Sequence, residues 1–247
     1  MTFQFKNPDY NSYYDNVYSD QERNWRRICA VDKADHVAKL LGLRQREIQN
    51  VLEVGCGTGD VIARLTALKI GNEFVGVDVI DPKMNNDAVR DIPNLSFVRQ
   101  TTDTLPFEDA SFDLVVASHV LEHVTDERHF LKELARVSRR YIYVEVPCEL
   151  HFRTTFSSLQ STLNIGHINA YSPQSFALTL ATSGLDIVDL QYFDHSVDAL
   201  AFHSSRARGV MKRLLRSTLL GLNKNLAAKL FTYHYGALCS TSQLLGR

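Results

Sequence analysis

The chain has 247 residues, of which 45% are hydrophobic, and its formal net charge is −1 at pH 7. This length and composition predict one large α/β domain with its own core rather than two equal domains. A near-neutral charge argues against a protein that works mainly by coating nucleic acid, which usually requires a strongly basic surface.

The predicted elements alternate between helices and strands along most of the chain. A helix is expected over 20–41, where apolar residues recur at helical spacing and Gly42 can end the helix. Five strands are expected over 50–54, 74–79, 95–99, 112–118 and 141–146, with helices over 60–68 and 122–137 between them. Beyond Pro147 we expect an insertion over 148–172, a helix over 173–183, a strand over 185–193, an amphipathic helical stretch over 206–230 and a final strand over 233–240.

This alternation predicts a Rossmann-like, mostly parallel, seven-stranded sheet with helices on both faces. An N-terminal helical lid and an insertion after strand five complete the expected fold. We treat 1–247 as a single domain, with an N-terminal helical segment over 1–45, a cofactor-binding core over 46–147 and a substrate-side part over 148–247.

The strongest motif is the glycine-rich segment that follows the first strand, from Glu53 to Gly59. A strand that runs through closely spaced glycines into a helix lets the backbone approach a ligand closely, and the helix N-terminus offers free N–H groups. The spacing is G-x-G-x-G, which differs from the G-x-G-x-x-G of dinucleotide sites. A dinucleotide oxidoreductase is therefore the less favoured interpretation of the fold.

Two acidic residues follow the next two strands. Asp78 ends the second strand, where a carboxylate can accept hydrogen bonds from ribose hydroxyls. Asp103 follows the third strand, where a carboxylate can accept a hydrogen bond from an adenine amino group. Together with the glycines, these acids predict an adenosine-containing cofactor.

With these motifs, the chain resembles the class I S-adenosylmethionine-dependent methyltransferases, of the small-molecule type that includes ubiquinone-type O-methyltransferases. The resemblance implies S-adenosylmethionine as cofactor and S-adenosylhomocysteine as product. It assigns the methionine part of the cofactor to the glycine segment, the ribose to Asp78 and the adenine to Asp103. The implied cofactor-binding residues are Glu53, Gly55, Cys56, Gly57, Gly59, Asp78, Val79, Thr102, Asp103, Ser118 and His119.

Histidines near the carboxyl ends of strands are the candidate bases for methyl transfer. The methyl group of a sulfonium is already electrophilic, so a base is needed only for an acceptor such as a hydroxyl or a protonated amine. His119 directly follows the fourth strand, and His167 lies in the insertion. On a helix, His119, Glu122 and His123 would share a face that His167 could complete as a metal site. Some related O-methyltransferases bind a divalent ion through a Glu-x-x-Glu-His pattern and a distant histidine. In this chain His119 takes the place of the first glutamate of that pattern, so no metal is predicted.

The ends of the chain allow two interpretations each. The aromatic N-terminus, with Tyr10, Tyr13, Tyr14, Tyr18 and Trp25, could order over the site or simply pack on the sheet. The basic, leucine-rich stretch over 206–230 could pack on the sheet, or it could contact an anionic membrane or a lipid-linked substrate.

The favoured function is methylation of a small molecule, at a hydroxyl oxygen of a sugar, a lipid or quinone precursor, or a natural product. No nucleic-acid partner is expected. A methyltransferase acting on protein or RNA, and a cofactor-binding partner subunit without turnover, stay open as alternatives. The four scattered cysteines and the polar N-terminus predict a cytoplasmic protein.

Overall fold

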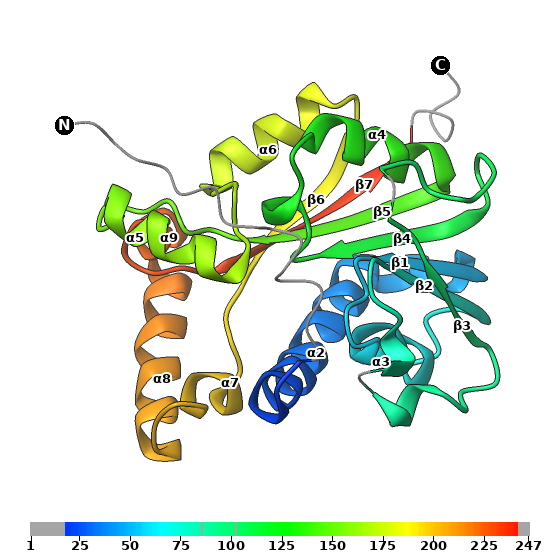
Figure 1. Cartoon of the computed structure of the whole chain (residues 1–247). Coiled ribbons are helices and arrows are strands. Elements are labelled where there is room, and N and C mark those ends of the chain that lie inside the picture. Colours follow the sequence, from blue (N-terminus) through cyan, green and yellow to red (C-terminus); the bar gives the residue numbers. More distant parts are fainter. Residues whose placement is uncertain (1–17, 85, 102, 242–247) are drawn as a thin grey trace.

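The computed structural model describes residues 18–84, 86–101 and 103–241. They form one seven-stranded sheet in the order β3-β2-β1-β4-β5-β7-β6, with helices on both faces (Figure 1). The strands are β1 (Asn50–Val54), β2 (Glu73–Asp78), β3 (Leu95–Arg99), β4 (Phe112–Ser118), β5 (Ser138–Pro147), β6 (Asp186–Phe193) and β7 (His234–Ser240). The α-helices are α2 (Asp20–Leu41), α3 (Asp60–Ala67), α4 (Glu127–Val137), α5 (Phe156–Thr162), α6 (Pro173–Thr182), α7 (Val197–Ala201), α8 (Arg206–Leu222) and α9 (Lys224–Leu230).

The sheet confirms the expected fold class. Strands β1 to β5 pair in parallel, and β7 lies antiparallel between β5 and β6. The strand order reverses between β1 and β4, because the chain fills one side of β1 with β2 and β3 and then the other side with β4. Ligands of open α/β sheets bind at the carboxyl ends of the strands at such a switch point.

Alternate side chains of the central strands pack into two separate hydrophobic cores, one on each face of the sheet. On β4, Leu114 and Val116 belong to the core beneath α2 and α3, whereas Val115 and Ala117 belong to the core beneath α4 and α6. All four side chains are fully buried. This double burial explains why the strand is an uninterrupted apolar run rather than an alternating one.

The expected helix over 122–137 is wrong at its start. A short 3-10 turn covers Leu121–His123, and α4 begins only at Glu127. Asp126 is the N-cap, and its side chain accepts a hydrogen bond of 2.9 Å from the backbone N–H of His129. Glu122 and His123 therefore do not share a helical face with His119.

The C-terminal third also differs in detail from the expectation. Asn223 divides the stretch 206–230 into α8 and α9, because its side chain caps α9 while its backbone ends α8. Helix α7 was not predicted, and Trp25 of α2 packs on Phe202 just after it, with ring centroids 5.0 Å apart. This contact agrees with packing of the N-terminal helix, whereas Tyr10, Tyr13 and Tyr14 lie outside the described residues. In the described part of the chain, no helix is both long and apolar enough to cross a membrane.

Candidate active site

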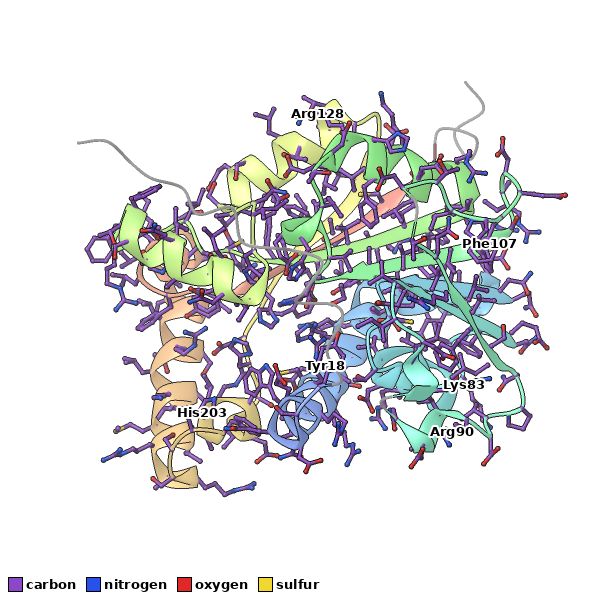
Figure 2. All side chains as sticks on the ribbon, viewed as in Figure 1. Tyr18, Lys83, Arg90, Phe107, Arg128 and His203 are labelled. Atoms are coloured by element: carbon purple, nitrogen blue, oxygen red, sulfur yellow. The ribbon has the colours of Figure 1, made fainter. Side chains whose placement is uncertain are left out.

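A cavity of about 340 Å³ opens at the carboxyl ends of β1, β2 and β4. Its walls come from the loops after these strands and from the start of α2. Tyr18, which Figure 2 labels near the middle of the molecule, lines it together with Arg26. The Arg26 guanidinium lies over the Tyr18 ring at 4.0 Å. The predicted residues that line this cavity are Gly55, Gly57, Asp78, Val79, Asp103 and His119.

The glycine loop takes conformations that other residues adopt only with strain. Gly55, Gly57 and Gly59 have φ of 74°, 54° and 73°. A Cβ on Gly55 would lie 2.4 Å from Val120, and one on Gly59 would lie 2.9 Å from Phe97. A Cβ on Gly57 would meet only Arg26, at 3.3 Å. Gly55 and Gly59 are therefore needed for packing, whereas Gly57 leaves room for a ligand.

Asp78 links the second strand to this loop. Its Oδ2 accepts a hydrogen bond of 2.7 Å from the Gly57 N–H, and its Oδ1 accepts one of 3.1 Å from the Ile80 N–H. Burial raises the pKa of Asp78, although these two backbone donors lower it. Asp78 thus fixes the loop and also lines the cavity.

Glu53 lies behind the loop and is almost fully buried. Its Oε2 has no hydrogen-bond partner. Burial raises the pKa of Glu53 to about 8. A buried carboxyl oxygen without a partner is costly unless a ligand supplies one, and a cationic amino group is a suitable partner.

Other predicted cofactor residues lie less directly on the cavity. The Cys56 side chain packs toward Gly76, and its backbone N–H donates to the Val77 carbonyl at 3.2 Å. Ser118 is buried, with its hydroxyl 3.5 Å from Glu145 Oε1. Thr102 lies outside the described residues. Their assignment to the cofactor stays a prediction.

His119 stands where the chain leaves β4. It has a left-handed φ of 59°, which is uncommon for a residue other than glycine. Its Nδ1 lies 3.5 Å from Glu122 Oε1, and its Nε2 lies 3.3 Å from Glu145 Oε1. Burial holds the pKa of His119 well below its usual range, so the ring is neutral at pH 7. A neutral imidazole beside a cavity, flanked by two carboxyls, can accept a proton.

His167 faces a different space from His119. It lines a second cavity of about 390 Å³ beneath α5. Its Nδ1 lies 3.0 Å from Glu149 Oε2, and its Nε2 lies 4.0 Å from Glu122 Oε1. Burial lowers the pKa of His167, but the two carboxyls outweigh it and raise the value overall. The His123 and His167 rings, 4.9 Å apart, separate the two cavities.

The sequence reasoning missed several residues of this region. Glu145 is fully buried in β5 and meets His119 on the cavity side. The signal was present, because a glutamate interrupts an otherwise apolar strand (YIYVEV). Glu149 and Arg26 carried no comparable local signal, whereas Tyr18, which lines the cavity, was among the aromatic residues expected either to order over the site or to pack on the sheet.

Comparison with known proteins supports a methyltransferase. Residues 52–141 match the family model of the methyltransferase domain. A ubiquinone/menaquinone biosynthesis C-methyltransferase of Campylobacter jejuni is 29% identical over 106 residues, which are 41% of this chain and 45% of that protein. The chloroplastic tocopherol O-methyltransferase of Arabidopsis thaliana is 37% identical over 100 residues, which are 38% of this chain and 28% of that protein.

Over residues 52–141 the chain matches the methyltransferase domain, and together with these relatives this match supports a class I S-adenosylmethionine-dependent methyltransferase. An S-adenosylmethionine-dependent methyltransferase structure from Aquifex aeolicus shares the fold, with a TM-score of 0.54 at 14% identity over 96% of this chain and 99% of that one. The match to the curated relatives covers less than half of their length.

The residues present fit S-adenosylmethionine, the cofactor named for the methyltransferase structure from Aquifex aeolicus. The open face of Gly57 and the side chain of Asp78 on the cavity wall offer contacts to a ligand with hydroxyl groups, and Glu53 behind the loop has one oxygen without a partner. When bound, the cofactor supplies an electrophilic methyl group. The chain's own residues then have to orient the acceptor, exclude water and handle its proton.

Proposed function

We propose that this chain transfers a methyl group from S-adenosylmethionine to a hydroxyl oxygen of a small-molecule acceptor bound beside His119. The observation that carries the proposal is the placement of His119. Its ring lies on the cavity next to the glycine loop, and Glu145 faces one of its two nitrogens. A cavity of small-molecule size favours this acceptor class over an open groove for protein or RNA.

In this proposal, His119 takes the proton of the acceptor hydroxyl between two buried carboxyls. Its Nε2 lies 3.3 Å from Glu145 Oε1 and its Nδ1 lies 3.5 Å from Glu122 Oε1, so both carboxyls stabilise the imidazolium that forms. Transfer of this proton to His119 would make the acceptor oxygen a better nucleophile toward the methyl group that bound S-adenosylmethionine would supply. His167 does not reach the same cavity, so we assign it a positioning role through Glu122.

The curated relatives include both a C- and an O-methyltransferase, so the atom methylated needs its own test. A phenol or enol hydroxyl would be activated by His119 in either case. The apolar second cavity behind His167 offers space for an acceptor tail. Product NMR distinguishes an O-methyl from a C-methyl group, and a C-methyl product would refute the oxygen assignment.

We also propose that α8 and α9 contact an anionic membrane surface that carries such acceptors. The stretch 206–230 has seven Lys or Arg residues and no acidic residue. Met211, Leu214 and Leu215 of α8 are each more than 60% exposed. In Figure 1, α8 extends away from the sheet. Exposed apolar side chains among cations are typical of helices that lie on lipid headgroups.

The buried thiols fit a reducing compartment, and we place the enzyme in the cytoplasm.

The first experiment is calorimetric titration with S-adenosylhomocysteine, using the wild type and Asp78→Ala. We expect micromolar binding and at least a tenfold loss in the variant, since a charge-assisted hydrogen bond contributes about 1.5–3 kcal/mol. Failure of the wild type to bind would refute the proposal. Binding without turnover across an acceptor screen, in which transfer of labelled methyl is followed, would favour the non-catalytic alternative.

A further inference from the structure

A second set of polar groups lies buried where α2, β5 and β7 meet. It consists of His36, Glu145 and His234, which are 8%, 0% and 4% exposed. His36 Nδ1 lies 2.8 Å from Glu145 Oε2, and His234 Nδ1 lies 3.4 Å from Glu145 Oε1. One ligand atom from each of the three lies within 4.8 Å of the others. Of the three, only Glu145 has a part in the chemistry proposed above.

The spacing of these atoms suits a small metal ion. First-row ions bind imidazole nitrogen and carboxylate oxygen at about 2.0–2.2 Å, so neighbouring ligands of a tetrahedral site lie about 3.3 Å apart. The observed separations of 2.8 and 3.4 Å lie on either side of that value. Two imidazoles and one carboxylate are a ligand set that transition ions prefer over Mg²⁺ or Ca²⁺.

The polar atoms of the cluster are not all satisfied within the protein. Nδ1 of His234 is buried and has no hydrogen-bond partner. It points toward Glu145 Oε1, which His119 Nε2 also approaches from the cavity side, at 3.3 Å. An unpaired buried nitrogen is costly, and a cation between it and Glu145 would give it a partner, in addition to the hydrogen bonds that the carboxylate already accepts from Tyr143 and Ser118.

We propose that His36, Glu145 and His234 bind a divalent first-row transition ion such as Zn²⁺. All three residues lie outside 52–141, so the site is a property of this chain's own N- and C-terminal parts. The ion joins helix α2 to strands β5 and β7. It also lies behind His119, because the Glu145 carboxylate contacts both the ion and that ring. The inference does not depend on the methyl-transfer proposal.

The test is metal binding by the full chain, freed of any affinity tag. Metal content is measured by mass spectrometry after purification, and Co²⁺ is then titrated into the chelator-treated protein while its visible d–d bands are recorded. We expect one equivalent to bind to the wild type. His36→Gln and His234→Gln should each weaken Co²⁺ by more than about 100-fold, because even the loss of an outer-shell partner costs 10–100-fold.

Two matched controls make the outcome specific. His203→Gln changes an exposed histidine (labelled in Figure 2), and His167→Gln changes the separate Glu122–His123–His167 group. Both should bind Co²⁺ as the wild type does, and circular dichroism confirms folding of every variant. Absence of binding in the wild type would overturn the proposal and leave an imidazole–carboxylate hydrogen-bond network. Loss of binding in His167→Gln, with His36→Gln unaffected, would also overturn it.

Discussion

Gly57 gives the sharpest test of how the cofactor loop works. Its φ of 54° requires the left-handed region, which costs other residues about 1–2 kcal/mol. In Gly57→Ala, the new methyl group would meet Arg26 at 3.3 Å and otherwise enter the cavity. For a domain of this size, the strain alone should lower Tm by roughly 2–8 °C. Overpacking against a ligand costs about 1–3 kcal/mol, so the Kd for S-adenosylhomocysteine should rise at least about tenfold.

Gly184 provides the matched control for this substitution. It has φ of 83°, and a Cβ there would have no neighbour within 4 Å. Gly184→Ala should therefore lose a comparable amount of Tm with no change in Kd. Calorimetry and thermal denaturation measure the two effects separately. If Gly57→Ala binds S-adenosylhomocysteine as tightly as the wild type, Gly57 does not face the cofactor and the reasoning fails.

Three further predictions concern charge, catalysis and membrane contact. Because burial raises the pKa of Glu53 to about 8, the ligand-free protein should lose stability as pH rises from about 4.5 to 8, by on the order of a few kcal/mol. Glu53→Gln should remove this slope, and parallel Tm–pH curves for the two proteins would contradict it. His119→Ala should lower kcat about 10²–10⁴-fold with little effect on cofactor affinity. As a control, His129→Ala, which changes another histidine of the cavity, should leave kcat unchanged. If His119→Ala has the same kcat as the wild type, His119 has no role in proton transfer. Replacing Met211 and Leu214 by Ser should weaken co-sedimentation with anionic vesicles about tenfold. If the wild-type protein does not sediment with such vesicles, α8 and α9 do not contact an anionic membrane.

The sequence predicted the cofactor half of the molecule well, because its signals are local. An apolar run that ends in G-x-G-x-G specifies a strand, a turn and a helix within ten residues, and Asp78 follows at the end of the next strand. Helix α4 was placed too early because apolar periodicity continued through Leu121 and Val124. The residue that sets the start of the helix is Asp126, which caps the N-terminus of α4 so that the helix begins at Glu127.

The acidic and imidazole groups around His119 could not be assembled from the sequence. His36 and Glu145 are 109 residues apart in the chain yet share a hydrogen bond. Contacts of this kind depend on which strands become neighbours, and no periodicity encodes that choice. His234 reaches Glu145 only because β7 runs antiparallel between β5 and β6, with Pro147 opposite His234.

The same strand pairing explains why a glycine stands at 236. Glu145 lies opposite Gly236 in the register of β5 and β7. A Cβ at that position would lie 2.8 Å from the Tyr143 hydroxyl and 2.9 Å from Phe193. Those two groups are the ones that hold the cluster: Tyr143 donates a hydrogen bond to Glu145, and Phe193 stacks on His36 with ring centroids 3.9 Å apart. Because Gly236 has no side chain, Tyr143, Glu145 and His36 can come together beneath the active site. Strand β7 therefore contributes to the site through this glycine as well as through His234.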